Sequence, residues 1–159
     1  MKNTEDRYIL RDISVEPLRS RYVEQISLNL ASMDPWLTLE YKPEVISFYL
    51  LRADPALKRY TVLVSNRVAG VMSLRHPWLF GPFLELIALF GDLRGKGIGA
   101  RLIDWICGQY PTAGNLWATV SSFNLDAQRF YLRMGFEQIA TLDNLIKPGR
   151  HEILLRKRL

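Results

Sequence analysis

The sequence has few of the residues on which cross-links and metal sites are built. Cys107 is the only cysteine, which excludes an internal disulfide, and its place beside Ile106 favours a small buried apolar residue over a nucleophile. The two histidines, His76 and His151, have no partner at metal-ligand spacing and are interpreted as ordinary surface or loop residues. We therefore expect no metal site.

Long apolar segments are absent as well. The longest apolar runs are too short to cross a bilayer, and residues 1–6 lack the apolar core of a signal peptide. The chain has no repeat period and no low-complexity tract, and its 48% of hydrophobic residues is typical of a globular protein. We expect one domain over residues 1–159, located in the cytosol and without a membrane partner.

Neither sign of charge is strongly in excess, since 21 basic and 16 acidic residues give a net charge of +5. The only basic run, Arg156-Lys157-Arg158, has no interleaved aromatic residues, and we interpret it as the solvated end of a C-terminal strand. This argues against nucleic acid as a partner. The mildly positive surface would still attract an anionic cofactor.

An apolar segment and an amphipathic segment are joined by a turn that is almost without side chains. Residues 83–90 are apolar except for Glu85, which predicts a buried strand. Apolar residues recur at helical spacing over residues 98–110, which predicts a helix with one buried face. The rest of the chain is interpreted from this junction.

Three glycines, Gly95, Gly97 and Gly99, lie where the strand becomes the helix. Glycine allows a positive φ and lets a ligand approach the main chain. The first N–H groups of the helix are unpaired and lie at the positive end of its dipole, so the junction is suited to bind a phosphate. The alternative is a turn that only lets the helix pack closely on the sheet.

Two known phosphate motifs fit this stretch poorly. The P-loop pattern fails because three residues, not four, separate Gly91 from Gly95, and because Lys96 is followed by Gly97. The dinucleotide fingerprint fits as Gly95-x-Gly97-x-x-Ala100, but no acidic residue follows at the distance expected for a ribose contact. A nicotinamide-type site is therefore not favoured.

Two motifs in the second half of the chain fit a third pattern. Arg94-x-x-Gly97-x-Gly99 matches the pyrophosphate signature Q/R-x-x-G-x-G/A, and Asn124-x-x-Ala127-x-x-Phe130-Tyr131-x-x-x-Gly135-Phe136 matches a second signature that follows it. Through these motifs residues 83–136, about a third of the chain, resemble the cofactor-binding core of the GNAT N-acetyltransferase superfamily. Two signatures in the right order are more specific than either alone.

The resemblance implies a mixed α/β sheet of about six to seven strands, splayed between the fourth and fifth strands and flanked by helices on both faces. Periodicity and turn signals predict the element order β-α-α-β-β-β-α-β-α-β-β. The predicted strands cover residues 7–13, 58–64, 68–75, 83–90, 116–120, 136–142 and 152–156. The predicted helices cover residues 15–33, 42–53, 98–110 and 124–134.

The resemblance implies acetyl-CoA as the acetyl donor. Backbone N–H groups of residues 95–100 would hold its pyrophosphate, and the main chain from Ile87 to Leu89 would pair with its pantetheine arm, with the N–H near Leu89 facing the acetyl oxygen. Asn124 is interpreted first as a helix cap and, by resemblance, as a contact to coenzyme A. The expected cofactor-binding residues are Ile87, Leu89, Arg94, Gly95, Lys96, Gly97, Ile98, Gly99, Ala100 and Asn124.

Two residues are the candidates for catalysis. Tyr131 falls at the general-acid position of the family, and a phenol with a pKa of about 10 suits proton donation to a thiolate. Its spacing alone favours a core residue beside Phe130 and Met134. Glu85 is the candidate base, because burial among apolar neighbours would raise its pKa. The alternative for Glu85 is a solvent-facing residue of an alternating strand.

The implied function is acetyl-CoA-dependent transfer of an acetyl group to a primary amine of a small molecule or a peptide. The alternative is a noncatalytic acyl-CoA-binding regulatory module of the same fold. We expect the first two helices, residues 76–82 and residues 143–150 to shape the acceptor site. Asp34, Glu40 and Glu44 are candidates to receive a cationic amine.

The loop over residues 76–82 is unexpectedly apolar. Trp78, Leu79 and Phe80 should not all face water, so they cover either a substrate pocket or a contact with a second copy of the chain, as in a homodimer.

Overall fold

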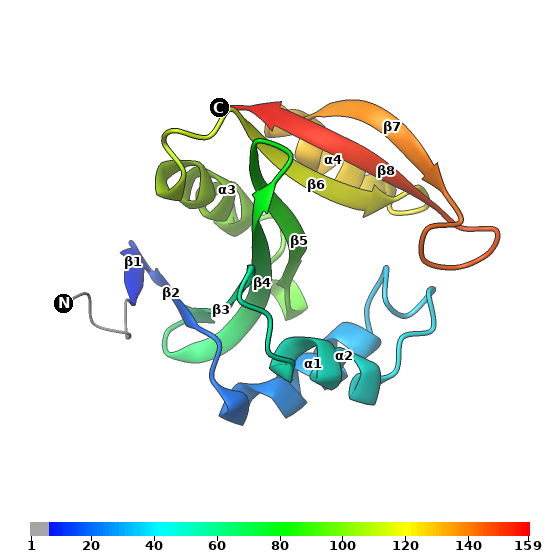
Figure 1. Cartoon of the computed structure of the whole chain (residues 1–159). Coiled ribbons are helices and arrows are strands. Elements are labelled where there is room, and N and C mark those ends of the chain that lie inside the picture. The colour runs from blue at the N-terminus through cyan, green and yellow to red at the C-terminus, as the bar shows by residue number, and fades with distance from the viewer. Residues whose placement is uncertain (1–6) are drawn as a thin grey trace.

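The computed structural model describes residues 7–159, so residues 1–6, whose sequence lacks the apolar core of a signal peptide, lie outside the described residues. Figure 1 shows one curved sheet with helices on both of its faces. The strands are β1 (Tyr8–Leu10), β2 (Ile13–Pro17), β3 (Leu57–Val64), β4 (Arg67–Trp78), β5 (Gly81–Leu89), β6 (Asn115–Ser121), β7 (Glu137–Asp143) and β8 (His151–Arg158). The helices are α1 (Val23–Ala31), α2 (Pro43–Leu51), α3 (Ile98–Gln109) and α4 (Leu125–Arg133), with 3₁₀ turns η1 (Ser20–Tyr22) and η2 (Gly91–Leu93).

Across the described residues the strand order is β1-β2-β3-β4-β5-β6-β8-β7. All neighbouring strands are antiparallel except β5 and β6, which are parallel. The predicted fold class, a mixed α/β sheet with helices on both faces, is therefore confirmed. The sheet has eight strands where about six to seven were predicted.

The extra strand comes from the N-terminal region. We predicted one strand over residues 7–13 and a helix over residues 15–33, but β1 and β2 form a hairpin and α1 begins only at Val23. Ile13 and Val15 are both buried in the core while Ser14 and Glu16 point to the other face, which is the period of a strand. Antiparallel pairing with β3 provides backbone hydrogen-bond partners for β2, and the strand ends at Pro17.

The parallel strands β5 and β6 separate soon after they meet. Their register contains only Phe83 opposite Trp117 and Leu84 opposite Ala118, whereas β5 continues to Leu89 and β6 to Ser121. The two halves of the sheet therefore diverge like the arms of a V, as Figure 1 shows for β5 and β6. This confirms the predicted splay between the fourth and fifth predicted strands. We call the region between the diverging ends, where β5 and β6 are no longer paired, the gap.

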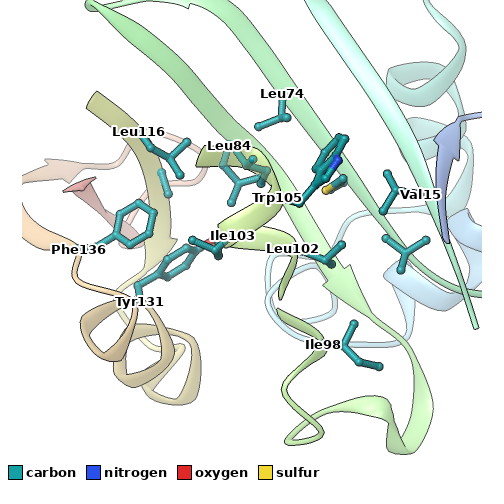
Figure 2. Close-up of a cluster of buried hydrophobic side chains, with 14 of the residues drawn as sticks. Val15, Leu74, Leu84, Ile98, Leu102, Ile103, Trp105, Leu116, Tyr131 and Phe136 are labelled. Atoms are coloured by element: carbon teal, nitrogen blue, oxygen red, sulfur yellow. The ribbon is translucent and has the colours of Figure 1, made fainter. Parts of the chain in front are cut away.

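Each face of the sheet has its own core. On one face, Leu84 and Leu116 of the sheet pack with Ile103 of α3 and Tyr131 of α4 in the cluster drawn in Figure 2, and we call this the α3–α4 face. On the other face, Leu86, Ala88 and Phe90 pack with α1 and α2, and we call this the α1–α2 face. Anything bound in the gap therefore has access to two different environments.

The apolar loop predicted over residues 76–82 is a tight hairpin instead. β4 extends to Trp78, and β5 starts at Gly81 after a two-residue turn in which Leu79 and Phe80 have positive φ. Trp78 stacks on Phe83 at 4.8 Å, and Trp117 Nε1 donates a hydrogen bond to the carbonyl oxygen of Leu79 at 2.9 Å. The hairpin thus lies at the closed end of the gap, and only its tip, with Phe80 90% exposed, is open to a partner.

None of the helices among residues 7–159 has the length and apolar character needed to span a bilayer.

Candidate active site

The glycine turn between β5 and α3 leaves open space beside the main chain. Gly95 and Gly97 have φ values of +76° and +73°, and a Cβ added at either position would meet no atom within 4 Å. A Cβ at Gly99, in contrast, would lie 3.0 Å from the Phe130 ring. Close helix packing therefore accounts for Gly99, while the other two glycines serve the backbone conformation and leave room for a ligand.

The first amides of α3 are placed for an anion. Gly97 is the N-cap and provides no side-chain hydrogen bond, and the first helical hydrogen bond runs from the Arg101 N–H to the Gly97 carbonyl at 3.2 Å. The N–H groups of Ile98, Gly99 and Ala100 precede that bond, at the positive end of the helix dipole. This arrangement fits a pyrophosphate.

The N-terminus of α4 is built differently. The Asn124 side chain accepts a hydrogen bond from the Ala127 N–H at 3.3 Å, which confirms its interpretation as a helix cap. Gly135, with φ of +83°, follows the C-terminus of the same helix, as predicted. The contact of Asn124 with coenzyme A remains a prediction.

Two cationic side chains flank the glycine turn. Arg94 is exposed and lines a hollow of about 260 Å³ together with Phe90, Gly91 and three residues from the end of α1 and beyond it, Asn29, Ser32 and Met33. Lys96 is also exposed, with its Nζ 3.7 Å from Asp92 Oδ2. Both cations are thus within the same turn as the open amides and can add charge to an anion site there.

The main chain of β5 faces the gap beyond Leu84. The Phe90 N–H donates to the Ala69 carbonyl of β4 at 2.9 Å. Because successive N–H groups of a strand point in opposite directions, those of Leu89 and Ile87 point away from β4, toward the gap that β6 has left. This is the orientation that an added strand, such as a pantetheine arm, requires.

Glu85 is the extra residue of a β-bulge. Leu84 pairs with Leu74 and Leu86 pairs with Ser73, so Glu85 has no partner in the register, and its side chain lies with Arg75. Arg75 Nε donates to Glu85 Oε2 at 2.8 Å. The expectation that Glu85 stands alone among apolar side chains is therefore wrong, because the register of β4 supplies a cation.

The same arginine also binds Asp54, the loop residue that follows α2. Arg75 Nη2 lies 3.0 Å from Asp54 Oδ2, and this hydrogen bond is the main reason why the pKa of Asp54 is lowered. The hydrogen bonds that Arg75 donates to Glu85 and Asp54 raise the pKa of Arg75. One guanidinium thus neutralises two carboxylates on the α1–α2 face, which weakens the case for Glu85 as a base.

Tyr131 is a buried phenol on the α3–α4 face. It is 5% exposed, and its ring centroid lies 5.1 Å from that of Phe136 and 5.4 Å from that of Phe130. Figure 2 shows its ring directed into the core cluster, which also contacts Ile87 and Leu89 of β5. Burial raises its pKa above the ordinary value, so the phenol stays protonated at neutral pH. The core interpretation is confirmed, and the role as proton donor remains a prediction.

Sequence reasoning missed a buried carboxylate on β8. Glu152 is 4% exposed, and its Oε1 accepts a hydrogen bond from Ser121 Oγ at 2.6 Å. Burial raises the pKa of Glu152, and the negative charge of Glu152 adds to the effect of burial in raising the pKa of Tyr41. The sequence placed Glu152 at the start of a strand, where nothing local distinguishes a buried carboxylate from a solvated one.

Two loops meet near this carboxylate. Lys147, in the connection between β7 and β8, forms an ion pair with Glu40 in the connection between α1 and α2, and this contact lowers the pKa of Glu40. Asp34 accepts a hydrogen bond from Thr38 at 2.6 Å. These two carboxylates, expected to receive a cationic amine, therefore already have partners within the chain. The third candidate, Glu44, is exposed in the first turn of α2.

Comparison with known proteins gives the same fold. The sequence pattern that defines the acetyltransferase (GNAT) family matches residues 22–136. No curated protein matches the chain. A solved acetyltransferase from Thermus thermophilus superposes with a TM-score of 0.75 at 17% identity, covering 92% of this chain and 97% of that chain.

Two further solved structures contain ligands. Arabidopsis thaliana Naa50, in complex with the bisubstrate analogue CoA-Ac-MVNAL, has a TM-score of 0.69 at 17% identity and covers 93% of this chain and 99% of its own. A proposed streptothricin acetyltransferase from Bacillus anthracis, in complex with acetyl coenzyme A, has a TM-score of 0.60 at 19% identity and covers 70% of this chain and 68% of its own. At these identities the likeness concerns the fold.

Proposed function

Because the chain belongs to the GNAT acetyltransferase family, we propose that it is an N-acetyltransferase that moves an acetyl group from acetyl-CoA to a primary amine of a small molecule or peptide. The observation that carries the proposal is the gap between β5 and β6 together with the glycine turn after β5, where a Cβ added at Gly95 or Gly97 would meet open space. A thioester in the gap and a pyrophosphate on the turn would belong to one extended ligand.

The residues present fit acetyl-CoA as a substrate. The space beside Gly95 and Gly97, which any Cβ would occupy, accommodates the pyrophosphate, and Arg94 and Lys96 add positive charge. The main chain at Ile87 and Leu89 pairs with the pantetheine arm. Two proteins of this fold were solved with acetyl coenzyme A and with a coenzyme A bisubstrate analogue, which supports acetyl-CoA as the ligand.

The chemistry follows from the two faces of the sheet. The amine nitrogen attacks the thioester carbonyl carbon, the Leu89 N–H stabilises the oxyanion, and the C–S bond breaks. Tyr131, on the α3–α4 face, gives its proton to the departing thiolate. The amine approaches from the α1–α2 face, so that the attacking and leaving groups are on opposite sides of the carbonyl.

A thiol-release assay tests the proposal. The wild-type protein is incubated with acetyl-CoA and a panel of primary amines, including a polyamine, an aminoglycoside, free amino acids and short peptides, and free coenzyme A is measured. We expect amine-dependent release with at least one class. Binding of acetyl-CoA by calorimetry without release for any amine would favour the noncatalytic acyl-CoA-binding module instead.

A further inference from the structure

Ser121 and Glu152 lie at the open end of the gap. Ser121 is the last residue of β6, three residues beyond Ala118, where the pairing with β5 ends. Because Glu85 is an extra residue in β5, the residue at the corresponding level on β5 is Ala88, which lies between Ile87 and Leu89, the two residues whose N–H groups point toward the gap. Glu152 pairs directly with Ser121 in the register of β6 and β8. The carboxylate is therefore on the strand next to β6, at the level along the sheet where the thioester is proposed to lie.

The pair is on the α1–α2 face. Leu116, Ala118 and Val120 of β6 belong to the core of the α3–α4 face, and alternation along the strand directs Ser121 to the other face. Glu152, as the cross-strand partner of Ser121, is on that face too. Tyr131 is on the opposite face. The two groups thus lie on the two sides from which an attacking nitrogen and a leaving sulfur would approach.

The surroundings of Glu152 differ from those of Glu85. Within residues 7–159, no lysine or arginine nitrogen lies within 4.0 Å of the Glu152 carboxylate, whereas Arg75 contacts Glu85 at 2.8 Å. The groups around Glu152 are the Ser121 hydroxyl from β6, the Tyr41 phenol from the α1–α2 connection and the apolar Leu142 from β7. On its own strand, the neighbouring His151 pairs with Asp143 at 2.9 Å. A carboxylate without a cation is free to take up a proton.

We propose that Glu152, positioned by Ser121, is the general base that accepts a proton from the acceptor amine. This inference rests on the proposed function and names the base for it. It replaces Glu85, whose carboxylate is held by Arg75.

The proton balance of the step is complete without a further reactant. Glu152 takes one proton from the ammonium group and passes it to solvent, and the free nitrogen then forms the N–C bond while the C–S bond breaks. Tyr131 protonates the thiolate, and the second proton of the nitrogen restores the phenol. The products are the amide, coenzyme A and one proton.

The test compares Glu152→Gln with wild type for acceptors of different basicity. At pH 7 an alkylamine, with a pKa of about 10, is almost fully protonated, whereas an α-amino group, with a pKa of about 8, is less so. We expect Glu152→Gln to lower kcat/KM for the alkylamine by about 10²- to 10⁴-fold and for the α-amino acceptor by clearly less. Ser121→Ala should reduce kcat/KM in the same sense but by a smaller factor.

The pH profile distinguishes a base from a structural residue. For wild type we expect kcat/KM to level off above the pKa of Glu152, whereas for Glu152→Gln it should keep rising toward the pKa of the amine. Glu24→Gln, which removes an exposed carboxylate from the first turn of α1, is the matched control and should follow wild type. Thermal unfolding checks that all variants are folded.

Three outcomes would overturn the assignment. If Glu152→Gln keeps the wild-type profile and the same dependence on amine pKa, Glu152 is not the base, while release of coenzyme A by wild type leaves the proposed function intact. If Glu85→Gln, and not Glu152→Gln, loses the plateau in kcat/KM that wild type shows at high pH, the base is Glu85. If wild type binds acetyl-CoA but no amine releases coenzyme A, both the function and the role of Glu152 are refuted.

Discussion

Arg75 Nε lies 2.8 Å from Glu85 Oε2, and this contact joins β4 to the bulge of β5. The same guanidinium reaches Asp54 at 3.0 Å, so that it connects the sheet to the end of the α1–α2 layer. All three side chains are largely shielded from water, with Arg75 23% and Glu85 20% exposed. The pair therefore connects β4, β5 and the end of the α1–α2 layer, and we expect it to contribute to stability.

We predict that Glu85→Gln lowers the free energy of unfolding by about 1–2 kcal/mol, because it replaces charge-assisted hydrogen bonds with neutral ones in a shielded place. For a chain of this size that corresponds to a fall of about 2–8 °C in Tm. Urea unfolding at pH 7 measures the difference. Arg67→Gln, an exposed change at the start of β4, is the control and should stay within about 0.5 kcal/mol of wild type. An unchanged Tm for Glu85→Gln would show that the pair contributes nothing.

Gly97→Val should abolish acetyl-CoA binding in a folded protein. Its Cβ would fill the space proposed for the pyrophosphate, and the positive φ of +73° disfavours a β-branched residue. We expect Kd to rise by at least about 10²-fold, since the amides of the first turn would lose their contact with the phosphates, and isothermal calorimetry measures it. Retained affinity would show that the pyrophosphate binds elsewhere.

The control for this change is Gly108→Ala, near the C-terminal end of the same helix. A Cβ there meets no atom within 4 Å and its φ is helical, so alanine should stabilise α3 by about 0.5–1 kcal/mol and leave the affinity for acetyl-CoA unchanged. Gly99→Ala should differ from both. Its Cβ would lie 3.0 Å from the Phe130 ring, so we expect the Gly99→Ala variant to be less stable than wild type.

Tyr131→Phe should lower kcat with little change in the affinity for acetyl-CoA. The ring and its packing on Phe136 are kept, and only the proton donor is lost, which costs about 10²-fold or more when a thiolate must leave unprotonated. Tyr110→Phe, which removes another half-buried phenol just after α3, is the control. Steady-state coenzyme A release and calorimetry give the two quantities. Unchanged turnover in Tyr131→Phe would remove the phenol from the mechanism.

The parts of the site that could be predicted from the sequence are those encoded by local patterns. The glycine turn, the cap at Asn124 and the C-terminal glycine at position 135 each depend on a few consecutive residues, and their backbone conformations are as expected. The splay was implied by resemblance to a family whose signatures lie in residues 83–136, and the register of β5 and β6 confirms it.

The parts that could not be predicted depend on register between distant strands. Arg75 meets Glu85 because a bulge shifts β5 by one residue against β4, and no local signal marks that bulge. Ser121 meets Glu152 only because β8 inserts between β6 and β7. At the N-terminus, the four-residue steps that suggested a helix over residues 15–33 gave way to a strand at β2, since pairing with β3 outweighed local periodicity.

The buried carboxylate of Glu152 should also reduce stability at neutral pH. Its folded pKa is raised above the unfolded value of about 4.5, mainly by burial, so the native state binds this proton more tightly than the unfolded state does. The free energy of unfolding therefore falls as pH rises from about 4.5 through the folded pKa. Glu152→Gln, which keeps a hydrogen-bonding partner for Ser121 but cannot ionise, should remove that fall. We expect the variant to exceed wild type in Tm at pH 8, with a difference that shrinks toward pH 4, as measured by thermal unfolding across this range. The exposed control Glu24→Gln should show no such trend, and a Glu152→Gln variant that is less stable than wild type at pH 8 would mean that the native site favours the ionised carboxylate.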